Sequence, residues 1–337
     1  MDKRSRVDAA VRGGAVDRPP VAAWRHFVDR EANAPDLAAA MVQWLRDYDW
    51  DFLKINPRAT YAVEAWGNRY DSGRYRGVGP TLVEPALRGP ADLGRVRRLD
   101  PGQGPFGEQL EAVRLIADAL GGEAHAIQTA FSPLSYLLAL FGGSGADPGA
   151  ADRLRQLERS DPDGLHGALD AIAATLADYA AEVLRAGASG LFFAVVKLAR
   201  AGQLTVEEYR RLARPYDLRV LAAVRGAPFT VLHVCGDGVF LAPFADYPVQ
   251  AVNWDVLGAG NPSLAEGKRI LPTAVAGATG EAGVLQSGTP EEVAALVRSA
   301  IEATDGRRLI VAPGCSAKPP QSEPNLRALR RAVEAPR

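Results

Sequence analysis

The sequence predicts an α/β fold of the (β/α)8 TIM-barrel type, and two observations lead to this prediction. Eight short apolar segments recur along the 337 residues, and most are separated by stretches with helical periodicity, an alternation typical of barrels with parallel strands. No glycine-rich phosphate loop follows the first apolar segment, which counts against an open, doubly wound sheet. We therefore expect a single barrel domain over residues 19–337.

The predicted strands are short runs rich in valine, isoleucine, leucine, phenylalanine and alanine. They cover residues 21–24, 52–55, 124–128, 190–196, 229–235, 249–255, 274–278 and 308–312. Apolar residues at spacings of three and four predict the helices. The helices cover about 36–48, 106–119, 150–186, 205–225, 289–304 and 324–334. Capping boxes at Thr205–Glu208 and Thr289–Glu292 mark the starts of two of them.

Two segments are expected to lie outside this alternation. Residues 1–18 are charged and contain glycine, so we expect a frayed N-terminal lead-in. Residues 66–106 are rich in glycine, with Tyr70 and Tyr75 between the glycines. This composition predicts a hairpin or loop excursion over one rim of the barrel.

Composition excludes several classes of function. Hydrophobic residues make up 47% of the chain, which is enough for a large core. The 39 basic and 40 acidic residues give a net charge of −1, which argues against a nucleic-acid partner. No apolar stretch approaches the roughly 20 residues that span a membrane, and the N-terminus lacks the apolar segment of a secretory signal. We expect a cytoplasmic protein with no membrane partner.

The most informative motif is His233-Val-Cys235 at the end of a predicted strand. Side chains two positions apart in a strand project from the same face, and imidazole and thiolate are ligands that zinc prefers. The second of only two cysteines, Cys315, ends another predicted strand. The residues alone leave alternatives open: a buried thiol, a hydrogen-bonded core histidine or a disulfide.

In a barrel the active site lies at the carboxyl ends of the strands. The residues at such ends are Arg25, Asn56, Gln128, His233, Cys235, Asp255 and Cys315. Strands that are distant in sequence would therefore bring the histidine and both cysteines to one shared mouth.

Several segments resemble the uroporphyrinogen decarboxylase superfamily, and most closely its zinc-containing branch, the methylcobamide:coenzyme M methyltransferases and related corrinoid-linked methyltransferases. The segments are Arg18–Val21, Asp51–Arg58, His233–Gly236, Val252–Asp255, Asn261–Ala265, Gly288–Val293 and Ala312–Cys315. The resemblance spans nearly the whole chain and implies a uroporphyrinogen decarboxylase-like barrel. It also implies that His233, Cys235 and Cys315 bind zinc, which binds the acceptor thiol.

The sequence departs from the decarboxylase pattern at three places. A decarboxylase carries Arg-Gln-Ala-Gly-Arg near its N-terminus, whereas residues 25–30 here read Arg-His-Phe-Val-Asp-Arg. The decarboxylase's Asp after the second strand has no counterpart beside Asn56, and its late Gly-His is replaced by Gly314-Cys315. These departures argue against decarboxylation of a porphyrinogen.

We therefore expect a zinc-dependent methyltransferase that activates a small thiol and takes a methyl group from a methylated corrinoid (methylcobalamin). No corrinoid-binding Asp-x-His-x-x-Gly motif occurs in the chain, so the corrinoid would be carried by a separate partner protein. The alternatives are a decarboxylase-like lyase that acts on a non-porphyrin carboxylate, and a zinc-binding barrel without catalytic activity.

Further side chains are assigned roles around the expected metal. Asp255 is the candidate fourth zinc ligand, with Asp237 second, and a structural role at the rim is the alternative for Asp255. The candidates for substrate binding are Arg25, Asn56, Arg58 and Gln128. Lys54, like Arg25 and Arg58, could hold a substrate anion, but an ordinary solvated or ion-paired charge is the favoured interpretation for it. His125 is expected to be structural.

Overall fold

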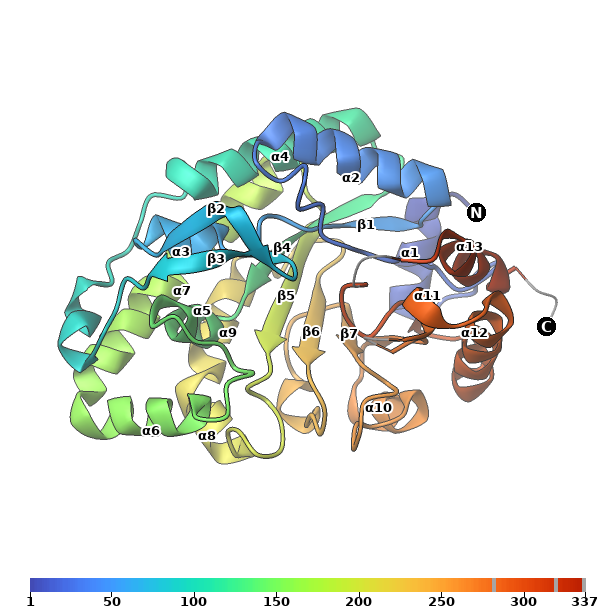
Figure 1. Ribbon diagram of the computed structural model, residues 1–337. Helices are drawn as coiled ribbons and strands as arrows, with labels where there is room; N and C mark the ends of the chain where they lie inside the picture. The colour runs from blue at the N-terminus through green and yellow to red at the C-terminus, as the bar shows by residue number, and fades with distance from the viewer. Residues whose placement is uncertain (281–282, 318–320, 335–337) are drawn as a thin grey trace.

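Seven parallel strands curl around the centre of the computed structural model (Figure 1), which describes residues 1–280, 283–317 and 321–334. In sheet order the strands are β1 (Phe52–Ile55), β4 (His125–Phe131), β5 (Gly190–Val196), β6 (Val231–Cys235), β7 (Ala251–Trp254), β8 (Ala274–Ala276) and β9 (Leu309–Ile310). Each is hydrogen-bonded to the next, in chain order. The predicted α/β barrel is confirmed, although several strands are shorter than the apolar runs that predicted them.

Residues 20–22 close the barrel between the first and last strands. Val21 forms a parallel bridge with Val311 beyond β9. The backbone amide of Asp51, just before β1, donates to the Val21 carbonyl at 2.9 Å. The predicted strand at 21–24 is thus reduced to one bridge, since Pro19 and Pro20 have no amide hydrogen to donate to a ladder.

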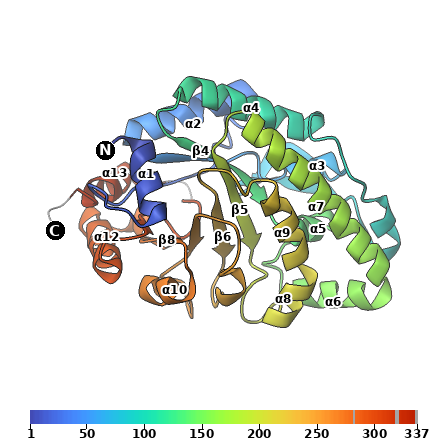
Figure 2. The same cartoon turned by 180° about the vertical axis from the view of Figure 1, so that it is seen from behind.

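Helices surround the sheet on its outer side, as Figures 1 and 2 show. They are α2 (Ala34–Tyr48), α3 (Tyr61–Ala65), α4 (Gly104–Leu120), α5 (Pro133–Leu140), α6 (Ala150–Ser160), α7 (Pro162–Arg185), α8 (Val206–Leu212), α9 (Arg214–Ala222), α10 (Leu264–Ile270), α11 (Val284–Ser287), α12 (Pro290–Thr304) and α13 (Glu323–Ala332), with 3-10 turns at Pro90–Arg95 and Ala242–Phe244. None of the helices in the described residues is long and apolar enough to cross a bilayer.

Two predicted helices are each divided in two. The stretch expected at 150–186 breaks at Asp161, which leaves helical geometry and accepts a hydrogen bond from the Gly164 amide to cap α7. The stretch expected at 205–225 breaks at Ala213, just before Pro215. Pro162 disfavours helical geometry at Asp161, the residue before it. Pro162 and Pro215 each lie in the first turn of the helix that follows the break, where proline is best tolerated.

The N-terminal segment does not fray, which corrects the expectation for residues 1–18. Residues Lys3–Arg12 form helix α1, and Arg6 and Val7 within it are buried. Arg6 donates to Asp51 Oδ1 at 2.7 Å, and Arg18 donates to Asp51 Oδ2 at 2.6 Å. Asp51 also accepts from the Val21 amide at 2.7 Å. One buried carboxylate therefore ties the N-terminal segment to the closure of the barrel.

The excursion between β1 and α4 contains an antiparallel hairpin, β2 (Arg69–Arg76) with β3 (Gly79–Glu84). Figure 1 shows this hairpin in front of β4 and β5, outside the barrel sheet. At its tip Gly77 has φ +63°, a left-handed conformation that glycine adopts without strain. The hairpin places its tip over the carboxyl ends of the strands, where it lines the pocket described below.

Because Asp51 is fully buried and holds two guanidinium groups, we expect Asp51→Asn to lower the free energy of unfolding by about 3 kcal/mol or more. The matched control is Asp49→Asn, since Asp49 ion-pairs with Lys3 and Arg330 but its side chain is 57% exposed. The control should change stability by less than about 1 kcal/mol. Denaturant titrations of both variants test this, and equal losses would contradict it.

Candidate metal centre and pocket

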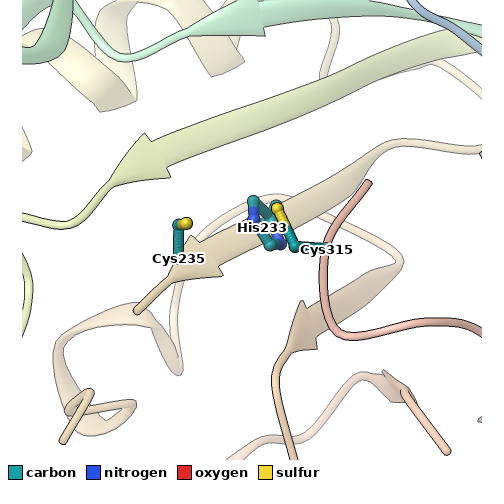
Figure 3. Close-up of side chains that lie close together, drawn as sticks. All are labelled: His233, Cys235 and Cys315. Carbon is teal, nitrogen blue, oxygen red and sulfur yellow. The ribbon is translucent and has the colours of Figure 1, made fainter. Parts of the chain in front are cut away.

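Three metal-ligand side chains converge at the carboxyl end of the barrel (Figure 3). His233 and Cys235 lie on β6, and Cys315 lies in the segment that follows β9. One ligand atom from each lies within 4.8 Å of the other two. Zinc binds thiolate sulfur at roughly 2.3 Å and imidazole nitrogen at roughly 2.1 Å, so these separations are close to those of ligands that share one ion.

Backbone hydrogen bonds on both sides hold the segment that carries Cys315. The Gly314 amide donates to the Thr279 carbonyl at 2.7 Å, and the Ala317 amide donates to the Trp24 carbonyl at 2.9 Å. Residue 314 must be glycine, because a Cβ there would lie 2.7 Å from the Asp255 Cα. This close approach brings Cys315 beside the ends of neighbouring strands.

The side chain of Asn253 determines which nitrogen of His233 faces the two sulfurs. The Asn253 amide group donates to the carbonyls of Ala276 and Pro313, at 2.9 and 3.1 Å. Its oxygen must therefore point the other way, where it lies 2.7 Å from His233 Nδ1. Nδ1 is then the protonated nitrogen, and the lone pair of Nε2 is left for a metal. This arrangement fits a zinc ligand.

The two cysteines are not joined in a disulfide. A hydrogen bond with Cys235 is the main reason that the pKa of Cys315 is well below its ordinary value. Burial opposes this shift, and a hydrogen bond with His233 adds to it. The surroundings thus favour a thiolate at Cys315, and thiolate is the form in which cysteine binds metal. The donor set and its spacing therefore fit zinc.

The cluster opens onto a pocket of about 530 Å³ at the carboxyl ends of the strands. Most of its lining is aromatic or aliphatic, from Trp24, Tyr61, Val78, Phe131, Tyr136, Phe192, Ala194 and Val196. The hairpin tip contributes Arg76, Gly77 and Val78. Phe193, on β5, is fully buried and lies outside the lining.

The pocket contains two titratable side chains, Lys54 and His26, whose positions the sequence analysis did not predict. Lys54, expected to be solvated or ion-paired, is only 5% exposed, and burial lowers its pKa to about 7. His26 also lines the pocket, and its pKa falls to about 4, chiefly through burial and then through the charge of Lys54. The sequence did contain a signal for Lys54, because it is the one charged residue in the otherwise apolar strand β1.

The two arginines predicted to bind substrate lie outside this pocket. Arg25 donates to the Gln321 side chain and stacks over the ring of Phe27 at 4.6 Å. Arg58 is held by Glu64 at 2.9 Å and by Glu108 at 3.3 Å. Both guanidinium groups already have partners, so the structure does not bring them to a substrate.

Asn56 and Gln128 do not line the pocket either. Asn56 donates to the Ser316 hydroxyl at 3.4 Å, which places it behind a lining residue. Gln128 is fully buried and donates to the Tyr179 hydroxyl at 2.8 Å. His125, expected to be structural, is fully buried and lies 2.9 Å from Asp8.

The carboxylate predicted as a fourth ligand does not join the cluster. Among the described residues, the ligand-type atoms that group here come from His233, Cys235 and Cys315. Asp255 Oδ1 instead accepts from the Leu257 amide at 3.0 Å. Asp237, the second candidate, is exposed after β6. Within the described part of the chain, three side chains therefore remain as candidate ligands.

We expect Asn253→Ala to weaken the binding of Zn²⁺ by about 10- to 100-fold, because His233 loses the acceptor that orients it. Asn325→Ala is the matched control: Asn325 is 1% exposed and donates to two carbonyls, those of Val284 and Gly288, and none of these three residues lines the pocket. Competition with a chromophoric chelator measures the affinity. Equal effects of the two substitutions would show a general loss of stability instead.

Comparison with solved structures shows the fold. A methyltransferase from Methanosarcina mazei superposes with a TM-score of 0.84 at 20% identity, covering 99% of this chain and 98% of that chain. A putative vitamin-B12-independent methionine synthase from Listeria monocytogenes has a TM-score of 0.57 at 16% identity, covering 89% and 85%. At such identities the likeness establishes a shared barrel architecture.

Comparison of sequences gives the family. The uroporphyrinogen decarboxylase of Prochlorococcus marinus (strain MIT 9211) is 27% identical over 347 residues, covering 94% of this chain and 93% of that protein. That of Synechococcus sp. (strain CC9605) is 27% identical, covering 96% and 94%. The family model for uroporphyrinogen decarboxylase (URO-D) matches residues 2–336. Because this match spans nearly the whole sequence, the chain belongs to the uroporphyrinogen decarboxylase (URO-D) family.

Proposed function

We propose that this protein is a zinc-dependent methyltransferase that transfers a methyl group to a small thiol. One observation supports the proposal above all: an imidazole and two cysteine sulfurs, from β6 and from the segment after β9, lie within 4.8 Å of one another at the wall of a pocket. Three protein ligands with space beside them is the arrangement of catalytic zinc sites, whereas structural sites have four.

The donor set suits attack by sulfur better than activation of water. When bound, zinc would keep a coordinated thiol deprotonated near neutral pH, where a thiol is otherwise mostly protonated. Two thiolates from Cys235 and Cys315 balance the charge of the ion. A third sulfur from the acceptor would give the site a negative charge, which favours donation of an electron pair to a methyl carbon.

The apolar lining has two roles in this proposal. Phe192 and Ala194 lie beside the cluster and exclude water from the acceptor sulfur, which strengthens electrostatic interactions there. The pocket of about 530 Å³ would hold the acceptor. A corrinoid is much larger than a small thiol, so we place the methyl donor at the mouth, carried by a separate protein.

A lyase that acts on a carboxylate is the second candidate, because the relatives of known name are uroporphyrinogen decarboxylases. A porphyrinogen carries many carboxylates, whereas the basic side chains among the described lining residues, apart from the candidate metal ligand His233, are Lys54, Arg76 and His26. This pocket suits a smaller carboxylate. The third candidate is a barrel that holds zinc without turnover.

We expect Cys315→Ala to lower the affinity for Zn²⁺ by at least about a hundredfold, since loss of a ligand should exceed the 10- to 100-fold effect of losing a supporting residue. Ser316→Ala, next along the chain and also lining the pocket, should retain the metal. Elemental analysis and circular dichroism measure zinc and fold. Full zinc occupancy in Cys315→Ala would rule out the proposed ligand set.

The protein substituted with Co²⁺ separates the three candidates. If the site is open to an acceptor, 2-mercaptoethanol should change the visible spectrum of the cobalt protein, and demethylation of methylcobalamin should depend on both thiol and enzyme. An unchanged spectrum would indicate a closed, non-catalytic site. Release of CO2 from a panel of aromatic and aliphatic carboxylates, without demethylation, would favour the lyase.

A further inference from the structure

We infer that the pocket selects a substrate with an apolar, aromatic-sized body and a single anionic group, and that Lys54 binds this group. The inference rests on the proposed function in so far as the pocket beside the cluster is where the substrate binds. The proposed function assigns no residue to the part of the substrate away from the reacting sulfur. Lys54 supplies that assignment.

Lys54 is a buried cation with no hydrogen-bonded or ion-paired partner among the described residues, although the charge of the Cys315 sulfur acts on it. Its side chain enters the pocket from β1 and is only 5% exposed. No hydrogen bond or ion pair joins its ammonium group to any residue that the structure describes; its neighbours are the rings of Phe192, at 4.6 Å, and Trp24, at 6.0 Å. Buried charges in proteins are normally paired, because desolvation without a partner is unfavourable.

The charged side chains of the lining also favour an anionic ligand. Besides Lys54, the hairpin tip contributes Arg76, and no aspartate or glutamate occurs among the described lining residues. Glu31, an acidic side chain 4.0 Å from the lining residue His26, accepts a hydrogen bond from Tyr75 at 3.1 Å and is not itself part of the lining. A carboxylate, sulfonate or phosphate on the substrate would therefore meet a cation and no competing carboxylate among the described lining residues, and a bound zinc ion would balance the charge of the two cysteine thiolates.

The size and polarity of the pocket limit the rest of the substrate. A volume of about 530 Å³ lies within the range of sites for ligands of roughly 300–1,000 Å³. A two-carbon thiol would leave most of the pocket empty. The walls come mainly from Trp24, Val78, Phe131, Tyr136, Phe192 and Val196, which match an aromatic or branched body. One buried ammonium group matches one anionic group rather than a polycarboxylate.

An anionic ligand would stabilise the charged form of Lys54, which burial destabilises. Burial lowers the pKa of Lys54 to about 7, and the charge of Cys315 opposes this shift only in part, so burial disfavours the charged form of the lysine. An anionic ligand would form a charge-assisted hydrogen bond in a dry site, where such bonds are strong. Aromatic faces on either side would direct the ammonium toward the cavity.

Two fluorescent probes with nearly the same aromatic body test the inference. 8-Anilinonaphthalene-1-sulfonate carries one anionic group, and N-phenyl-1-naphthylamine carries none. We expect Lys54→Met, which keeps the length of the side chain, to weaken binding of the sulfonate probe at least about tenfold and to leave the neutral probe within about twofold. Lys197→Met, which removes a charge at the same end of the barrel outside the lining, is the control and should change neither.

Equal weakening of both probes by Lys54→Met, or no effect on either, would overturn the inference. Circular dichroism confirms the fold of the variant, and Lys54→Gln serves as a second uncharged variant should Lys54→Met fold poorly. The two variants test the metal centre and the anion site separately. Cys315→Ala should lose zinc but keep its preference for the sulfonate probe. Lys54→Met should keep its zinc. A wild-type protein that binds no zinc would refute the metal centre without touching the anion site.

Discussion

The hydrogen bonds of one side chain, Asn253, support the whole candidate site. Its amide group donates to the carbonyls of Ala276 and Pro313, and its oxygen accepts from His233. It thereby joins β7 to β6, to β8 and to the segment that carries Cys315. The imidazole is fixed in orientation and tautomer, and the sulfur of Cys315 is brought to it. A buried amide with every group committed in this way has only one arrangement.

The barrel closes through a second polar centre at its other end. Asp51 is fully buried and joins Arg6, Arg18 and the amide of Val21. The same stretch of chain then supplies β1 and Lys54, so the closing contact and the pocket share one strand. Between the two ends an aromatic layer fills the interior, with Trp24 5.3 Å from Phe192 and Phe52 5.0 Å from Phe229. Its rings contact the site: Phe192 packs against both His233 and the ammonium group of Lys54.

Membership of the URO-D family fixes the barrel and leaves the chemistry to local substitutions. Cys315, in the segment after β9, places a potential sulfur ligand beside the other strand ends. The two arginines predicted from the sequence to bind substrate have other partners: Arg58 pairs with Glu64, and Arg25 packs on Phe27. Positive charge in the pocket comes instead from Lys54 and Arg76. A lining with few charges and many rings suits a different substrate from a polyanionic porphyrinogen.

The sequence by itself determined the periodic features. Apolar runs located the strands, and the period of two placed His233 and Cys235 on one face, because local backbone geometry dictates both. Tertiary structure alone decided which distant groups meet. Contacts between segments far apart in the chain decide that Gln128 bonds to Tyr179 and that Arg25 bonds to Gln321. They also decide that residues 3–12 fold against Asp51. The absence of an ion-paired partner for Lys54 among the described residues depends on such contacts too, since a lysine is paired or unpaired only through what the fold places beside it.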